Sequence, residues 1–159
     1  MSNPTTYAGA TVGICATPQN DDLDDHASTG FPGLTYVDIA NVGTIGEYGY
    51  TTNMVNYPTM DRTLNLYAKG NTDGGSMSIE CAVKTGDLGQ AAIIAAADPN
   101  AGANYQDNYA FKITLPNGDV HYVRGPVGGP TYPGGGNEDF VRMSFMVGVN
   151  QILIVPATP

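Results

Sequence analysis

The sequence predicts a mainly β protein, an antiparallel β-sandwich or barrel with one flanking α-helix, and three observations lead to this prediction. Several segments alternate hydrophobic and polar residues, which is typical of strands that bury one face. Turn-forming residues separate these segments, with 21 glycines and 11 prolines in 159 residues. Only one segment has the flanking signals of a helix. Together these features favour a single domain over residues 1–159.

The clearest strands lie in the second half of the chain. Alternation places Met77, Ile79, Cys81 and Val83 on one face of residues 76–83. Residues 109–115 and 139–150 alternate in the same way, with Val141, Met143, Phe145, Val147 and Val149 expected to point inward. Asn117-Gly118 predicts a hairpin turn with positive φ at both residues, followed by a strand over 119–125. Residues 151–156 either continue the preceding strand or form a final one.

The first half of the chain is less regular. Residues 11–17 and 34–40 are predicted strands, and residues 41–50 continue the second one in weaker form. Residues 51–61 show no period, so we expect an extended loop over 48–62 with a return strand at 63–70. Further loops are expected at 18–33 and 126–137, an N-terminal arm at 1–10 and a C-terminal tail at 156–159.

The single helix is predicted over about residues 87–98. Asp87 is the expected N-cap, Gln90 fits a variant of the capping box, and Pro99 ends the helix. Leu88, Ala92 and Ala95 fall on one face, with Ile93 and Ile94 near its borders. This alanine-rich surface is expected to pack closely against a sheet.

Composition and charge exclude several classes of protein. Fifteen acids oppose six bases, and the net charge of −9 argues against a protein that grips DNA phosphates. No apolar run approaches the roughly 20 residues of a membrane-spanning helix. The 42% hydrophobic content and ten tyrosines argue against disorder. Cys15 and Cys81 are expected to be buried thiols, with a single disulfide or a reactive thiol as alternatives.

The sequence contains no set of residues at the spacing of a known catalytic or metal site. His26 and His121 stand far apart in the sequence, and neither has a neighbour at metal-ligand spacing. The acidic run over residues 21–25 has the oxygen ligands that calcium prefers, but it lacks the spacing of an EF-hand and is expected to be a solvated loop. We therefore predict no enzyme activity, no catalytic residues, no cofactor and no metal.

Three segments resemble a known family when taken in order. Residues 108–118 and 122–125 (NYAFKITLPNG and YVRG) resemble a hairpin of the major tail tube proteins of long-tailed, lambda-like bacteriophages. Residues 87–92 (DLGQAA) resemble the start of that family's helix, and residues 41–47 (NVGTIGE) are similar to one of its strands. The resemblance covers about residues 34–155, and the acidic loop at 18–33 departs from it.

The resemblance implies a structural virion protein whose six-subunit rings stack into a hollow tube for DNA ejection. Each subunit would contribute strands to a continuous inner barrel, while loop 48–62 and the termini reach adjacent subunits or rings. The expected contact residues are Tyr48, Tyr50, Met54, Tyr57, Met60 and Tyr132, because tyrosines and methionines suit protein interfaces. The expected acidic residues of the lumen are Glu80, Glu138 and Asp139, which would repel DNA phosphates.

The same resemblance implies the partners and the location. Besides further copies of itself, the chain would meet a tape-measure protein and terminator or tip proteins, with DNA only in transit and no membrane. The expected location is the phage tail, after assembly in the host cytoplasm. Two alternatives remain open, namely a single-ring tail terminator or connector and a soluble β-sandwich binding module of adhesin type.

Overall fold

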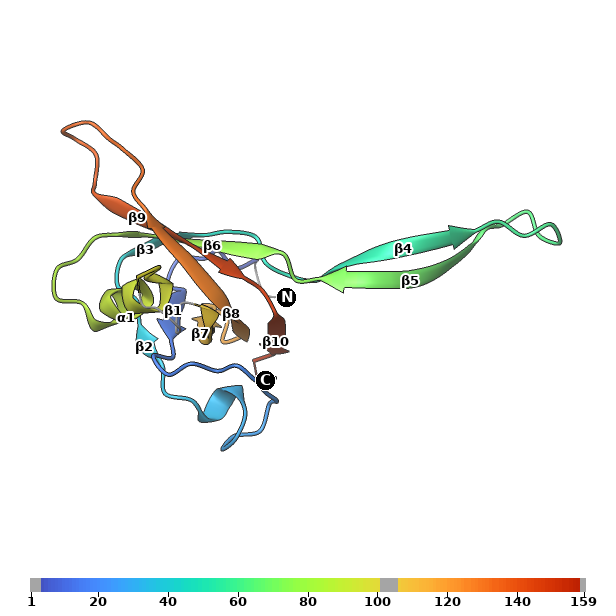
Figure 1. The fold of residues 1–159 in the computed structure, drawn as a ribbon, viewed down its shortest axis with the longest axis horizontal. Coiled ribbons are helices and arrows are strands. Elements are labelled where there is room, and N and C mark those ends of the chain that lie inside the picture. Colours follow the sequence, from blue (N-terminus) through green and yellow to red (C-terminus); the bar gives the residue numbers. More distant parts are fainter. Residues whose placement is uncertain (1–3, 101–105, 158–159) are drawn as a thin grey trace.

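The computed structural model describes residues 4–100 and 106–157 (Figure 1). Residues 1–3 of the expected N-terminal arm and 158–159 of the expected tail lie outside this described part. The strands are β1 (Thr11–Ile14), β2 (Val37–Asp38), β3 (Val42–Ile45), β4 (Thr51–Tyr57), β5 (Leu66–Asp73), β6 (Ser76–Ala82), β7 (Asn108–Thr114), β8 (Val120–Thr131), β9 (Arg142–Gly148) and β10 (Gln151–Val155). The helices are α1 (Leu88–Ala97) and the short 3-10 helix η1 (Phe31–Gly33). The prediction of a mainly β chain with one α-helix is confirmed.

All the strand pairs are antiparallel, and the long strand β8 joins two sections of one sheet. Its first half pairs with β7 and β10, and β1 and β2 extend this section beyond β7. Its second half pairs with β9, followed by β6 and β3. The sheet ends at β2 on one side and at β3 on the other, so the described chain does not close the barrel that was one predicted form.

The main core lies among the two sheet sections and α1. It contains alternate residues of the strands whose periodicity predicted burial, such as Met77, Ile79, Phe111, Phe145 and Val147. A second cluster of Cys15, Phe31, Ala110 and Tyr122 lies beneath the segment between β1 and β2. Burial of Cys15 and Cys81 is confirmed, and both thiols are free and belong to different clusters.

The acidic segment between β1 and β2 is anchored to the sheet, although its carboxylates face solvent. Arg124 on β8 is only 4% exposed and donates to the carboxylate of Asp22, the backbone oxygen of Gln19 and the side chain of Gln151. Gln151 in turn bonds both the backbone N–H and the carbonyl of Leu23. The segment therefore covers the second core cluster and is not only the solvated loop that its composition predicted.

The helix α1 begins as predicted, but it buries a different face. Asp87 is the N-cap, and its carboxylate accepts from the Gln90 amide at 2.9 Å. The buried residues of the helix are Gly89, Gln90, Ile93, Ala96 and Ala97, whereas Leu88 is 75% exposed. Gly89 lies so close to β2 that a Cβ would stand 2.0 Å from the Asp38 carbonyl oxygen. Because Gly89 and the side chain of Gln90 occupy the contact with the sheet, Leu88 lies on the solvent side of the helix.

Two predicted loops are strands in the structure, and one predicted turn differs in detail. Residues 51–57 form β4, and β8 extends through part of the glycine-rich segment to Thr131. At the hairpin of residues 116–118, Gly118 has a φ of 96°, but Asn117 does not have positive φ. This three-residue loop needs positive φ only at its last residue, because a type I turn precedes it. Residues 151–155 form a separate final strand, β10, which settles the alternative left open by the sequence.

Candidate interaction surfaces

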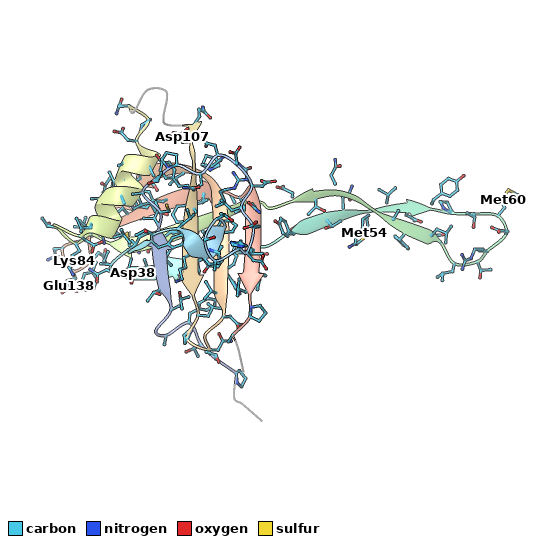
Figure 2. The ribbon with its side chains drawn as sticks, turned by 90° about the horizontal axis from the view of Figure 1, so that it is seen from below. Asp38, Met54, Met60, Lys84, Asp107 and Glu138 are labelled. Carbon is cyan, nitrogen blue, oxygen red and sulfur yellow. The ribbon has the colours of Figure 1, made fainter. Side chains whose placement is uncertain are left out.

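Strands β4 and β5 form a hairpin, here called the arm, that projects from the rest of the molecule (Figures 1 and 2). The two strands pair only with each other. Every residue of β5 is exposed, and so is every residue of β4 except the partly buried Thr52. An isolated two-stranded hairpin is marginally stable in water, so such an arm is expected to find cover from a partner.

The two faces of the arm differ in polarity. Paired residues lie on the same face, so Val55 and Tyr57 share one face with Ala68 and Leu66. We call these four residues the apolar arm face. The opposite face carries Met54 and Lys69, Asn56 and Tyr67, and then Thr52 and Thr72. Val55 is 50% exposed and Tyr57 is 69% exposed, so the apolar arm face is in contact with water.

Two tyrosines tie the base of the arm to the body. The hydroxyl of Tyr48 lies 2.6 Å from Nδ1 of His121 on β8. Burial, with a smaller contribution from Tyr7, raises the pKa of Tyr48 to about 12, so its hydroxyl is protonated at neutral pH. The hydroxyl of Tyr50 accepts from the amide of Ile152 and donates to the carbonyl of the same residue. These bonds hold the segment from which the arm leaves the sheet.

The six contact residues predicted from the sequence therefore lie in three places. Met54, Tyr57 and Met60 lie on the arm, with Met60 at its tip (Figure 2). Tyr48 and Tyr50 lie at the arm base and use their hydroxyls within the chain. Tyr132 is 60% exposed and lies at the start of the loop between β8 and β9, apart from the arm. The structure brings together three of the six.

A second candidate surface is the outer face of the section formed by β3, β6, β9 and the second half of β8. Its inner face belongs to the main core, through residues such as Met77 and Phe145. Its outer face carries one large apolar side chain, Met146, and otherwise small or polar residues, which are Thr44, Ser76, Ser78, Glu80, Ala82, Gly128, Thr131, Arg142, Ser144 and Gly148. Among the described strands, none pairs with the far side of β3 or with the far side of residues 127–131 of β8. The section thus has two open edges.

The three predicted lumen acids do not lie together. Glu80 lies on this outer face, where Arg142 of β9 donates to it at 3.3 Å. Both side chains are partly exposed, so the pair balances the charge of the face and adds little stability. Glu138 and Asp139 lie in the loop between β8 and β9, which extends beyond the strands (Figure 1). The Asp139 carboxylate accepts from the Gly136 amide within this loop.

Sequence reasoning missed a third surface, the helix patch, made of Val83, Leu88, Ile94, Phe140 and Val141. The Val83 amide donates to the Val141 carbonyl at 2.9 Å, which joins the segment before α1 to the loop before β9. Val83 and Val141 were expected inside because the alternation continues through them, yet they are 42% and 68% exposed. Strand β6 ends at Ala82, just before Val83, and strand β9 begins at Arg142, just after Val141. The outer side of α1 adds only Ala91 and Ala95 between its two large apolar residues.

Two other kinds of site are absent from the described residues. Residues 4–100 and 106–157 contain no cluster of three or more His, Cys, Asp or Glu side chains that could hold a metal ion. Within the same ranges, no helix has the length and apolar character needed to cross a membrane. The hollows of the surface are open grooves, such as the one of about 310 Å³ beside Tyr48 and His121.

The sequence matches no known family profile, and a search of curated proteins finds no match. Solved structures do match. One is from the sheath/tube terminator of an extracellular contractile injection system, PVC, in its extended state, with a TM-score of 0.63, 10% identity, and coverage of 98% of this chain and 99% of that chain. Another is the SPP1 tail tube, with a TM-score of 0.58, 18% identity, and coverage of 95% and 78%. The chain has the fold of tail tube proteins.

A further match widens this tail tube fold to other parts of such assemblies. A chain from the tube-terminating cap of the anti-feeding prophage has a TM-score of 0.62 and 11% identity, with coverage of 99% of this chain and 94% of that one. These matches come from contractile injection systems and from SPP1, so they support the tail tube fold in general and not a lambda-like member. The three matches are thus a tube-terminating cap, a sheath/tube terminator and a tail tube.

Proposed function

We propose that this chain is the major tube subunit of a phage-like tail, forming six-membered rings that stack into a hollow tube. The observation that carries the proposal is the four-stranded section with a polar outer face and two open edges. Open edges are templates for pairing with another chain. If β3 of one subunit pairs with the second half of β8 in the next, a ring closes into a continuous barrel with the polar face inward.

The chemistry of the outer face suits a conduit that does not hold its cargo. A nucleic-acid groove would carry unpaired lysines and arginines. Here the one arginine of the face, Arg142, is paired with Glu80, and the other outward residues are mostly small or hydroxylated. On this proposal Glu80 faces the lumen, and Glu138 and Asp139 border its mouth. DNA would then pass without tight binding, repelled by a chain whose net charge is −9.

The arm accounts for contacts between subunits or between rings. Its exposed tyrosines and methionines, including Tyr57 and Met60, supply interface area, and the termini are the other candidate arms. In an assembled tail the ends of the tube would meet tape-measure, terminator or tip proteins. The location on this proposal is the virion, after assembly in the host cytoplasm.

A tube terminator, which forms a single ring, is the second candidate function. The observation that favours it is the match to the PVC sheath/tube terminator, where 98% of this chain and 99% of that chain are covered. The arm with its uncovered apolar face favours the stacked tube, since a repeated contact between copies would cover this face in every ring.

Negative-stain microscopy of the concentrated protein tests the proposal. Long hollow tubes support the major tube subunit, isolated rings support the terminator, and monomers at high concentration contradict both and favour a soluble binding module. Gly43→Lys places a charge on the open edge strand β3, where a new Cβ meets no atom within 4 Å. We expect this variant to lose tubes and rings, whereas Ala27→Lys, in an exposed loop away from this section, keeps them.

A further inference from the structure

The apolar arm face and the helix patch are two exposed apolar surfaces that contacts within the described chain do not explain. The arm face offers Val55, Tyr57, Leu66 and Ala68, and all four are exposed although each is paired with a residue of the other strand. The four residues therefore already have their strand partners within the hairpin. What the arm lacks is a surface that removes these side chains from water.

The helix patch lies on the body, around the solvent side of α1. A surface helix normally turns charged and polar side chains to solvent. The exposed positions of α1 are Leu88, Ala91, Ile94 and Ala95, so its solvent side bears no polar side chain. A helix that is apolar on both sides is typical of buried positions, which indicates that this side is covered when the protein is assembled.

The two surfaces lie at opposite ends of the molecule. In both views the arm projects from one end of the body and α1 lies at the other (Figures 1 and 2). One copy therefore does not reach its own patch with its own arm. A contact between different surfaces of identical chains is heterologous, and it repeats from copy to copy.

The charges of the two surfaces are complementary. Residues 54–69, the outer part of the arm, contain one acid, Asp61, and two bases, Arg62 and Lys69, a net charge of +1 in a chain of net charge −9. Residues 83–94 and 138–142, which carry the patch, hold three acids, Asp87, Glu138 and Asp139, against two bases, Lys84 and Arg142, a net charge of −1. Other parts of the acidic body would be repelled by the patch, whereas the outer arm is not.

We propose that the apolar arm face of one copy lies against the helix patch of a second copy. The inference rests on the proposed assembly into tubes and adds the surface on which the arm docks. A charge placed in this contact is expected to weaken assembly, since it must be buried without a partner. An opposite charge placed on the helix patch is expected to pair with the charge on the arm face and to restore assembly, because the two positions meet between copies.

The test compares two neighbouring positions of the arm. Val55→Glu enters the apolar arm face, while Asn56→Glu enters the opposite face, and both residues are exposed. We expect Val55→Glu to raise the protein concentration needed for tubes by about tenfold or more, and Asn56→Glu to leave it within about twofold. Leu88→Lys should weaken assembly like Val55→Glu, and the double variant Val55→Glu/Leu88→Lys should recover most of it.

Readouts are negative-stain microscopy and sedimentation velocity, so that rings and short oligomers are also scored. All three positions are exposed, and a melting temperature within about 2 °C of wild type confirms folding of each variant. The docking inference is wrong, while the proposed function stands, if the wild type forms tubes and Val55→Glu forms them equally well. The same holds if the double variant assembles no better than Val55→Glu alone. A wild type that stays monomeric at every concentration overturns both.

Discussion

At the scale of single residues, Gln90 organises the junction between helix and sheet. Its side chain is 2% exposed, accepts from the Lys84 amide and donates to the carbonyls of Ala40 and Ala82. These groups come from three segments that meet beside α1. A buried amide that satisfies three backbone groups fixes their arrangement, because any other side chain leaves them without partners.

Gln90→Leu is therefore expected to lower the free energy of unfolding by about 2–3 kcal/mol, since it leaves buried backbone groups unpaired. Urea denaturation measures the change. Gln106→Leu is the matched control, because Gln106 is exposed, and it should stay within about 0.5 kcal/mol of wild type. Equal effects of the two substitutions would contradict the role assigned to Gln90.

Asp87 gives the protein a pH-dependent contribution to stability. The backbone N–H of Gln90, which donates to the Asp87 carboxylate, lowers the pKa of Asp87, and burial only partly opposes this. A folded-state pKa below the unfolded value of about 3.9 stabilises the protein above that pH, and this stabilisation is lost as pH falls through the folded pKa.

Asp87→Ala should cost about 0.5–2 kcal/mol at pH 7, the usual range for loss of an N-cap. The difference from wild type should shrink as the pH falls below about 4, because protonation removes the charged acceptor in the wild type. Thermal melts from pH 7 downward measure it. Asp25→Ala, in the exposed segment before η1, is the control and should stay within about 0.5 kcal/mol of wild type at pH 7.

Several residues of the segments that resemble tail tube proteins hold elements of the fold together. Gly89 allows α1 to approach β2, and Gly125 allows β8 to pass the end of β9, where a Cβ would stand 1.7 Å from the Gly148 carbonyl oxygen. Arg124 anchors the acidic segment. Asp87 was predictable as a cap because capping is local. The partners of Gln90 and Arg124 were not, because they come from distant parts of the chain.

At the scale of elements, the arm is the part that contributes least to the body. Replacing residues 51–73 by a short turn is expected to leave the melting temperature within about 2 °C, because β4 and β5 pair only with each other. The body should keep its circular dichroism and its cooperative transition. A loss of several degrees would show that the arm supports the core within a single chain.

The arm also explains where strand prediction from sequence succeeds. Strands β6, β7 and β9 were predicted because the core selects every second residue. The strand β4 was predicted as a loop because neither face of it is buried in the chain, so nothing imposes a period of two. Alternation continues past the ends of β6 and β9 into Val83 and Val141, and these two residues lie in the helix patch.

At the scale of the whole molecule, a mainly β domain with one helix was predictable, and the open sheet was not. Composition and periodicity identify strands, but closure depends on which strands pair, and β8 pairs with β7 on one half and β9 on the other. The uncharged outer side of α1 was not predictable either, because it becomes visible only once the buried face of the helix is known.

The placement of the arm and the helix patch at opposite ends gives an assembled protein a direction. In a chain of such contacts, one end presents free arms and the other presents free patches. A subunit without an arm can still receive the arm of a neighbour, but it cannot reach the next patch. When it is mixed with intact subunits, it ends the series of arm–patch contacts, and the lengths of the assemblies fall as its share rises.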